Sequence, residues 1–286
     1  MGTNLLFVPG NNPAMVQNAG ILGADTVIFD LEDAVSGEQK DAARKLLKMA
    51  LESITYEGCE TSVRINAMDT PYWEMDLKIV AEAGIDGLII PKAEHGKDIE
   101  RISDILDTIP GADGVFLIPL VESALGVENV YGIASSSKRV RGVFFGAEDY
   151  TADIGAVRTK GGEEILWARG RIVNGAAAAG VEAIDTPFTD VEDIEGLKKD
   201  TLFAKALGFD GKASVSPRHC GLIREIFYPG DEEIRYAIRV IDTVKEAEKT
   251  GKGVASMDGR MIDKPIVLRA LKVLRAAGIK EDFRYE

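Results

Sequence analysis

Cysteine and histidine are scarce in this chain of 286 residues, which contains two of each. The cysteines, Cys59 and Cys220, are far apart and lack the spacing of metal ligands. We therefore expect free thiols in a cytoplasmic protein rather than a disulfide. The same scarcity argues against a clustered nitrogen and sulfur site of the kind that binds zinc.

Positive charge is also in deficit, with 34 Lys and Arg against 47 Asp and Glu and a net charge of −13. This balance argues against a nucleic-acid-binding surface and against adhesion to anionic membranes. Long apolar runs are missing, since no stretch approaches the roughly 20 residues of a membrane span. The start, Met1 to Asn4, lacks the basic segment and apolar core of a signal peptide, so none is expected.

Short apolar runs do occur, and they alternate with segments of helical period. Alternating units of this kind predict a parallel sheet. Eight such units favour a closed (β/α)8 TIM barrel over a doubly wound sheet. In addition, no Gly-x-Gly-x-x-Gly follows the first strand, which argues against a Rossmann fold. The predicted strands are 5–8, 26–30, 62–65, 87–90, 115–121, 140–145, 181–184 and 212–215. The predicted helices are 14–22, 38–53, 72–83, 97–108, 124–136, 162–179, 190–207 and 218–226.

The pattern changes after residue 226, so we predict a barrel over 1–226 and a C-terminal helical extension over 227–286. Residues 231–249 read as one long amphipathic helix, and Pro265 opens a last helix that ends near Ala277. The segment 250–263 between them is rich in glycine and polar residues, and it carries Asp258 and Asp263. We interpret it as a lid loop. The extension packs on its own barrel or on a neighbouring subunit.

Polar groups follow almost every predicted strand, where a barrel places its active site. Glu122 and Asp149 come directly after apolar strands and are the best candidates for a pair of metal ligands. Capping of the next helix or pairing with lysines is the alternative for both. We expect Glu148 to hydrogen-bond groups that surround the metal ligands rather than to bind the metal itself.

Three acids, Asp30, Glu32 and Asp33, follow the second predicted strand, where they cap a helix, hold a metal-bound water or pair with an arginine. Arg64 ends the third strand and needs an anionic partner because burial of a lone guanidinium is costly. That partner is a substrate carboxylate or an internal acid such as Glu32 or Asp33. Lys92 contacts a substrate phosphate or carboxylate, or pairs with Glu94.

Oxygen ligands without a histidine or cysteine cluster point to Mg²⁺ or Mn²⁺. Such an ion chelates a 2-oxo acid and polarises its carbonyl. The residues alone therefore indicate cleavage or formation of a carbon–carbon bond at an oxo acid, without a Schiff base.

Several stretches along the whole chain resemble the citrate lyase β-subunit family, within the wider group of malyl-CoA and citramalyl-CoA lyases. The resemblance implies a Mg²⁺-dependent lyase on a (β/α)8 barrel that forms trimers or hexamers. It would cleave citryl-CoA or a citryl-carrier protein to an acetyl thioester, such as acetyl-CoA, and oxaloacetate. The stretches are 6–12, 29–35, 63–66, 121–123, 145–155, 184–188, 208–212 and 261–265.

The resemblance also implies roles for particular residues. Glu122 and Asp149 match the metal ligands, and Arg64 matches the arginine that binds the substrate's carboxylate and carbonyl. Asp263 matches an acid that the C-terminal segment of an adjacent subunit supplies as general acid or base. The loop with Asp30, Glu32 and Asp33 matches the family's acidic loop, which lies behind the metal and Arg64. We expect Asp33 to take part in catalysis, and Gly146, Ala147 and Glu148 to contact the substrate.

One departure from the family lies at the start, where many relatives carry Arg-Arg or Arg-Ser before the 6–12 stretch. We therefore expect Lys92 or Arg158 to contact the phosphates of the thioester arm. The substrate stays open: malyl-CoA or citramalyl-CoA is the nearer alternative. The other alternative is a non-catalytic subunit that only binds thioesters within a complex. In either case, α and γ citrate lyase subunits are candidate partners.

Overall fold

The computed structural model describes residues 3–249, 255–257 and 259–281 of the chain. These fall into two compact units, Met1–Glu225 and Ile226–Glu286, which are described separately below. Within the described residues, no helix is long and apolar enough to cross a membrane.

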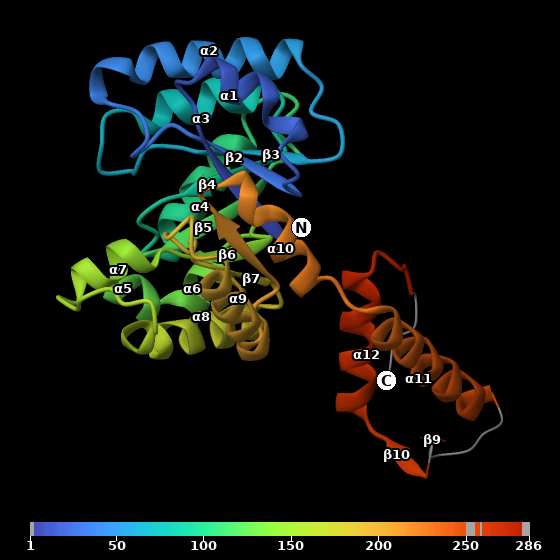
Figure 1. The fold of residues 1–286 in the computed structure, drawn as a ribbon. Coiled ribbons are helices and arrows are strands. Elements are labelled where there is room, and N and C mark those ends of the chain that lie inside the picture. Colours follow the sequence, from blue (N-terminus) through green and yellow to red (C-terminus); the bar gives the residue numbers. More distant parts are fainter. Residues whose placement is uncertain (1–2, 250–254, 258, 282–286) are drawn as a thin grey trace. The chain divides into compact units, whose positions relative to one another are not determined.

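The first unit is a closed barrel of eight parallel strands in sequential order, which confirms the predicted (β/α)8 fold (Figure 1). Nearly all strand residues are buried, because one face lines the barrel interior and the other lies under helices. The interior packs Leu5, Ile28, Ile89, Phe144 and Ile184 together with their neighbours. The strands are β1 (Asn4–Pro9), β2 (Thr26–Asp30), β3 (Glu60–Arg64), β4 (Gly87–Ile90), β5 (Phe116–Val121), β6 (Gly142–Phe145), β7 (Glu182–Asp185) and β8 (Gly211–Ser214).

Aspartates at the amino ends of three strands fix the barrel's register. Asp25, before β2, accepts the backbone N–H of Thr3 at 2.8 Å. Asp86, before β4, accepts that of Thr61 at 2.7 Å, and Asp210, before β8, accepts that of Ala183 at 2.9 Å. In each case the carboxylate ties its own strand to the preceding one, so a slip of one residue would break the bond.

The helices of the barrel unit follow the predicted alternation, with two differences. The predicted helix 124–136 is two helices that meet at Asn129, whose side chain donates to Glu94 O at 2.9 Å. A further helix, α7, directly follows β6. The helices are α1 (Pro13–Asn18), α2 (Lys40–Ser53), α3 (Trp73–Glu82), α4 (Gly96–Leu106), α5 (Ala124–Glu128), α6 (Val130–Ala134), α7 (Ala147–Asp153), α8 (Leu166–Ala179), α9 (Ile194–Leu207) and α10 (Pro217–Phe227), with single turns at Ala19–Ile21, Gly37–Gln39 and Glu163–Ile165.

The second unit pairs α11 (Asp231–Lys249) with α12 (Lys264–Ala276). Their apolar faces form a separate core that includes Val240, Val244, Val267 and Leu274. The predicted loop 250–263 contains a two-stranded antiparallel ribbon, β9 (Ala255–Met257) and β10 (Arg260–Ile262). The segment predicted as a lid loop therefore includes a β-ribbon that the sequence did not indicate, whereas Asp258 and residues 250–254 lie outside the described residues.

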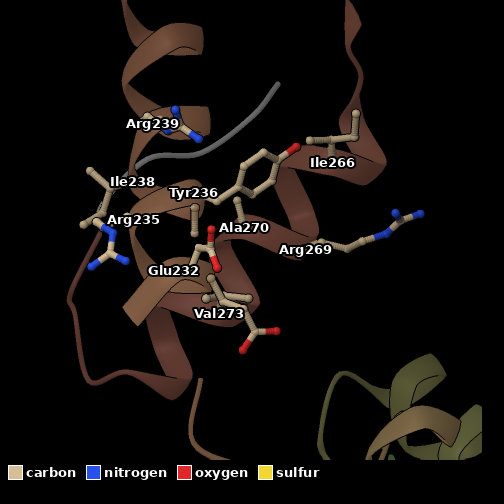
Figure 2. A pocket seen from close by; sticks show the side chains of 11 residues that line it. Glu232, Arg235, Tyr236, Ile238, Arg239, Ile266, Arg269, Ala270 and Val273 are labelled. Carbon is tan, nitrogen blue, oxygen red and sulfur yellow. The ribbon is translucent and has the colours of Figure 1, made fainter. Parts of the chain in front are cut away.

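A groove of about 830 Å³ lies on this unit, lined by α11 and α12. Figure 2 shows Tyr236 of α11 and Ile266 of α12 at its wall, with Arg235, Arg239 and Arg269 nearby. None of the residues predicted at the strand ends lines it. Its size alone therefore does not make it the catalytic site.

Candidate functional site

Asp30 and Arg64 form the first pair at the carboxyl ends of the strands. They are the last residues of β2 and β3, and the sheet register places them side by side. Arg64 Nε donates to Asp30 Oδ1 at 2.7 Å and Nη2 donates to Oδ2 at 2.6 Å. Both residues are buried, so this bidentate pair fixes the plane of the guanidinium. The internal partner left open by the sequence is therefore present, and it leaves Nη1 to face other groups.

The acidic loop after β2 surrounds that remaining nitrogen. Arg64 Nη1 lies 3.1 Å from Glu32 Oε2 and 3.3 Å from Asp33 Oδ2. Burial raises the pKa of Glu32 to about 7, with Arg64 opposing the rise and Asp33 adding to it. The buried Lys40 ammonium donates to Leu31 O and Glu32 O, each at 2.7 Å, and so holds the loop in place.

Glu122 follows β5 and is only 5% exposed. Its Oε1 accepts the backbone N–H of Lys92 at 2.7 Å. Lys92 has a φ of 50°, the one positive value at a non-glycine position in the described part of the chain. A β-carbon on Gly146 would lie 2.8 Å from Glu122 Oε2, closer than real contacts allow, so the approach of β6 to this carboxylate requires glycine.

Asp149 and Glu148 lie in the first turn of α7 and are exposed. The N-cap of this helix is Gly146, which has no side chain to accept a capping hydrogen bond. Instead, Ala147 N at the first helical position donates to Thr186 Oγ1 at 3.2 Å, and Thr186 directly follows β7. The start of α7 is therefore fixed by the neighbouring strand end.

Two cavities meet at Glu122 and Asp149. One, of about 470 Å³, is also lined by Asp30, Arg64 and Thr186. The other, of about 560 Å³, extends towards Lys92 and the loops after β3 and β4. The two carboxylates therefore stand where a ligand in either space could reach them.

The carboxylate pair fits a Mg²⁺ ion. Mg²⁺ uses one or two protein carboxylates and completes its shell with water and substrate. Among the described residues, no three His, Cys, Asp or Glu side chains converge, at this site or at any other, so the pair stands without a third protein carboxylate. Burial raises the pKa of Glu122 to about 8, and Glu32 and Asp149 add to the rise. A cation beside Glu122 would supply the missing counter-charge.

The predicted phosphate contacts differ in their surroundings. Lys92 is exposed at the rim of the second cavity, and Glu94 accepts a hydrogen bond from Ser123 Oγ at 2.6 Å. Arg158 lies 3.2 Å from Glu148 and 2.7 Å from Glu164, so two acids already occupy its guanidinium. Partial burial acts to raise the pKa of Glu164. Hydrogen bonds from Thr159 and Arg158 outweigh this effect and lower the pKa to about 2.

Asp263 belongs to the C-terminal unit, where it begins α12. Its Oδ1 accepts the backbone N–H of Ile266 at 3.2 Å, and the side chain is exposed. A helix cap of this kind leaves the second carboxylate oxygen open to solvent or to a partner.

Three groups that hold the site were given no role from the sequence. Thr186 and its neighbour Asp185 directly follow the seventh predicted strand. Two adjacent polar residues at that strand end are the signal that could have indicated a role for Thr186. Lys40 lies on the face of α2 that packs on the loop, a position that sequence spacing does not reveal. Asp76 reaches Asn66 N at 2.9 Å from α3 and supports the end of β3 from outside the barrel.

A sequence profile described as HpcH/HpaI aldolase/citrate lyase matches residues 3–217. The citrate lyase subunit beta of Leuconostoc mesenteroides subsp. cremoris is 43% identical over 96% of this chain and 92% of its own. The mitochondrial citramalyl-CoA lyase of Rattus norvegicus is 33% identical over 97% and 86%. The crystal structure of CitE from Mycobacterium tuberculosis with magnesium, acetoacetate and coenzyme A is 31% identical, covers 97% and 98%, and superposes with a TM-score of 0.75. The chain belongs to the HpcH/HpaI aldolase/citrate lyase family.

Proposed function

We propose that this chain is a Mg²⁺-dependent carbon–carbon lyase that cleaves citryl-CoA or a citryl-acyl-carrier protein to an acetyl thioester and oxaloacetate. The observation that carries the proposal is the buried Glu122, which shares one cavity with Asp149 and Arg64. The citrate lyase subunit beta relative supports the reaction class. The magnesium and coenzyme A bound to the CitE neighbour support the cofactor and a thioester substrate.

Glu122 and Asp149 hold the metal in this proposal, with Mn²⁺ as an alternative ion. When bound there, Mg²⁺ supplies the positive charge that polarises the oxygen of the oxo-acid half. Arg64 binds a substrate carboxylate through its Nη1 side, because Asp30 occupies the other side of its fork. The substrate there competes with Glu32 and Asp33, which lie 3.1 and 3.3 Å from Nη1. Gly146, Ala147 and Glu148 line the same cavity and contact the substrate.

The chain's own residues move the protons. Asp33, 72% exposed and in the wall of the Arg64 cavity, accepts the proton of the substrate hydroxyl. The carbon–carbon bond then breaks, and its electron pair passes to the α-carbon of the thioester. Asp263 of a neighbouring copy gives that carbon a proton, which completes the acetyl group. Asp30 and Glu32 keep Arg64 and the acidic loop in position.

Supply of Asp263 by a neighbour requires a homo-oligomer, which we propose to be a trimer or hexamer. The exposed Tyr236 and Ile238 beside the α11–α12 groove supply apolar surface for such packing. We also propose that the thioester arm passes Lys92, whose ammonium is exposed, rather than Arg158, which two acids occupy. Association with α and γ citrate lyase subunits would deliver the carrier-bound form of the substrate.

The test is release of oxaloacetate from citryl-CoA by the purified chain with Mg²⁺ and then with EDTA. We expect turnover with Mg²⁺ and its loss with EDTA or in Glu122→Gln, whose amide oxygen can still accept the Lys92 N–H. Turnover that survives both changes would contradict the metal assignment.

The rat relative favours one second candidate, cleavage of citramalyl-CoA. Citramalyl-CoA, malyl-CoA and citryl-CoA are therefore compared by kcat/KM. A preference for either of the first two would replace the substrate while keeping the site. Metal binding without turnover of any free thioester would indicate a carrier-bound substrate or a thioester-binding subunit.

A further inference from the structure

Helix α7 carries Asp149, and it is held at both ends by groups outside the carboxylate pair. At its start, the buried Thr186 hydroxyl accepts the N–H of Ala147, two residues before Asp149. At its end, Asp153 Oδ2 accepts the N–H of Ala124 at 2.7 Å, two residues after Glu122. The helix therefore spans the gap between the loop that bears Glu122 and the end of β7.

Thr186 is itself fixed by a buried cation. Its carbonyl oxygen accepts from Lys212 Nζ at 2.6 Å, and Lys212 has no exposed surface. The same ammonium contacts Asp185 Oδ2 at 2.6 Å and Asp200 Oδ2 at 2.7 Å. Arg169 donates to Asp185 through Nε at 2.9 Å and Nη2 at 2.8 Å, so this anchor is rigid.

The fixed ends matter because α7 is a helix of seven residues with an exposed first turn. A helix this short has little stability of its own. Its position relative to Glu122 therefore depends on tertiary hydrogen bonds. The backbone of the N-cap Gly146 donates to Val121 O at 2.9 Å. The side chains that bind the two ends are those of Thr186 and Asp153. Loss of either would let Asp149 drift from Glu122.

From this arrangement we infer that Thr186 and Asp153 are positioning residues that set the place of Asp149 relative to Glu122 for Mg²⁺ binding. The inference rests on the proposed metal site and deepens it. Groups that orient metal ligands typically contribute about 10- to 100-fold to metal affinity. Neither residue needs to touch the ion for this effect.

The experiment measures the Kd for Mg²⁺ by calorimetry on the purified full chain, with thermal unfolding as a check of folding. Thr186→Val removes the acceptor at constant shape, whereas Thr186→Ser keeps it. We expect Thr186→Val to weaken Mg²⁺ binding by about 10-fold or more and Thr186→Ser by less than about 3-fold. Thr201→Val is the matched control, since Thr201 is equally buried but lies in α9, where its hydroxyl donates to Leu197 O, and it lines neither cavity; it should leave Kd unchanged.

Asp153 provides a second test that does not depend on a buried position, because its side chain is exposed. Asp153→Ala removes both the charge and the acceptor, and Asp153→Asn removes the charge alone. We expect weaker Mg²⁺ binding in Asp153→Ala and near-native binding in Asp153→Asn. Equal weakening in both would assign the effect to charge and overturn the role given to Asp153.

Wild-type Mg²⁺ binding distinguishes failure of the proposed function from failure of the positioning role. If the wild type does not bind Mg²⁺ at all, the proposed function fails. If it binds, and folded Thr186→Val and Asp153→Ala bind equally well, the positioning role alone is overturned. If Thr186→Val does not fold, the Asp153 pair decides.

Discussion

Arg64 presents its Nε and Nη2 to Asp30 in a two-point contact of 2.7 and 2.6 Å, so the orientation of this guanidinium is set before any substrate arrives. Lysine cannot reproduce such a fork. We expect Arg64→Lys to lower kcat/KM by about 100-fold or more, because misplaced substrate groups cost that much. Arg171→Lys, on the surface pair with Glu128, is the control and should have near-native activity. Near-native activity of Arg64→Lys would contradict the role of Arg64 in substrate binding.

Gly146 gives a steric test of the metal pair. In Gly146→Ala the new β-carbon would lie 2.7 Å from Glu122 Cβ, so the carboxylate must move. We expect Mg²⁺ affinity to fall by about 10-fold or more while the chain stays folded. Gly170→Ala is the control, because nothing lies within 4 Å of its added β-carbon and it sits inside α8. That change should raise stability by up to about 1 kcal/mol. Calorimetry and thermal melts together distinguish the two glycines.

The raised pKa of Glu122 predicts how pH affects stability. The free carboxyl ionises near 4.5, whereas in the folded, metal-free protein its pKa is about 8. As pH rises between these values, the unfolded state releases its proton first, so the free energy of unfolding falls. Mg²⁺ displaces the proton, so its stabilising effect should be larger near pH 8 than near pH 6 in scanning calorimetry. Glu122→Gln should abolish the difference, and an equal Mg²⁺ effect at both pH values would contradict the assignment.

The proposed sharing of Asp263 between copies predicts complementation. Asp263→Asn and Glu122→Gln should each be inactive alone, since each breaks every site. After unfolding and refolding an equal mixture, roughly a quarter of the sites in a cyclic oligomer would combine two intact residues. We expect that fraction of wild-type activity in an oxaloacetate assay. A mixture as inactive as its parents would place Asp263 in its own chain or outside the reaction.

The buried cluster around Lys212 should be costly to break. Lys212→Met leaves Asp185 and Asp200 with Arg169 alone, and we expect a loss of about 3–5 kcal/mol in urea unfolding. Lys160→Met also breaks two ion pairs, with Asp190 and Asp193, but Lys160 is 65% exposed. Because water screens exposed pairs, its loss should cost much less stability than that of Lys212. Similar costs for the two variants would contradict the role of burial.

The barrel could be predicted because its strands are short apolar runs that end in charged residues. The same feature predicted that Glu122, Asp149 and Arg64 lie together at the carboxyl ends of the strands. Predicting that Asp30 occupies the fork of Arg64 would have required the register between β2 and β3, which sequence spacing does not give. The helix break at Asn129 and the ribbon after α11 were missed because each depends on tertiary contacts. The anchoring of α7 by Thr186 was hidden for the same reason.

The three aspartates that tie strands together all lie at the amino ends of the barrel, opposite the reacting groups. Three of the eight strand pairs are thus tied by these aspartates at one rim, and the proposed chemistry occupies the other. We expect that exchanging loops at the proposed catalytic rim with those of a lyase for another thioester would leave these three ties intact. This separation makes the scaffold a suitable host for engineering new substrate ranges, and it offers a physical reason why one fold accommodates several related lyases.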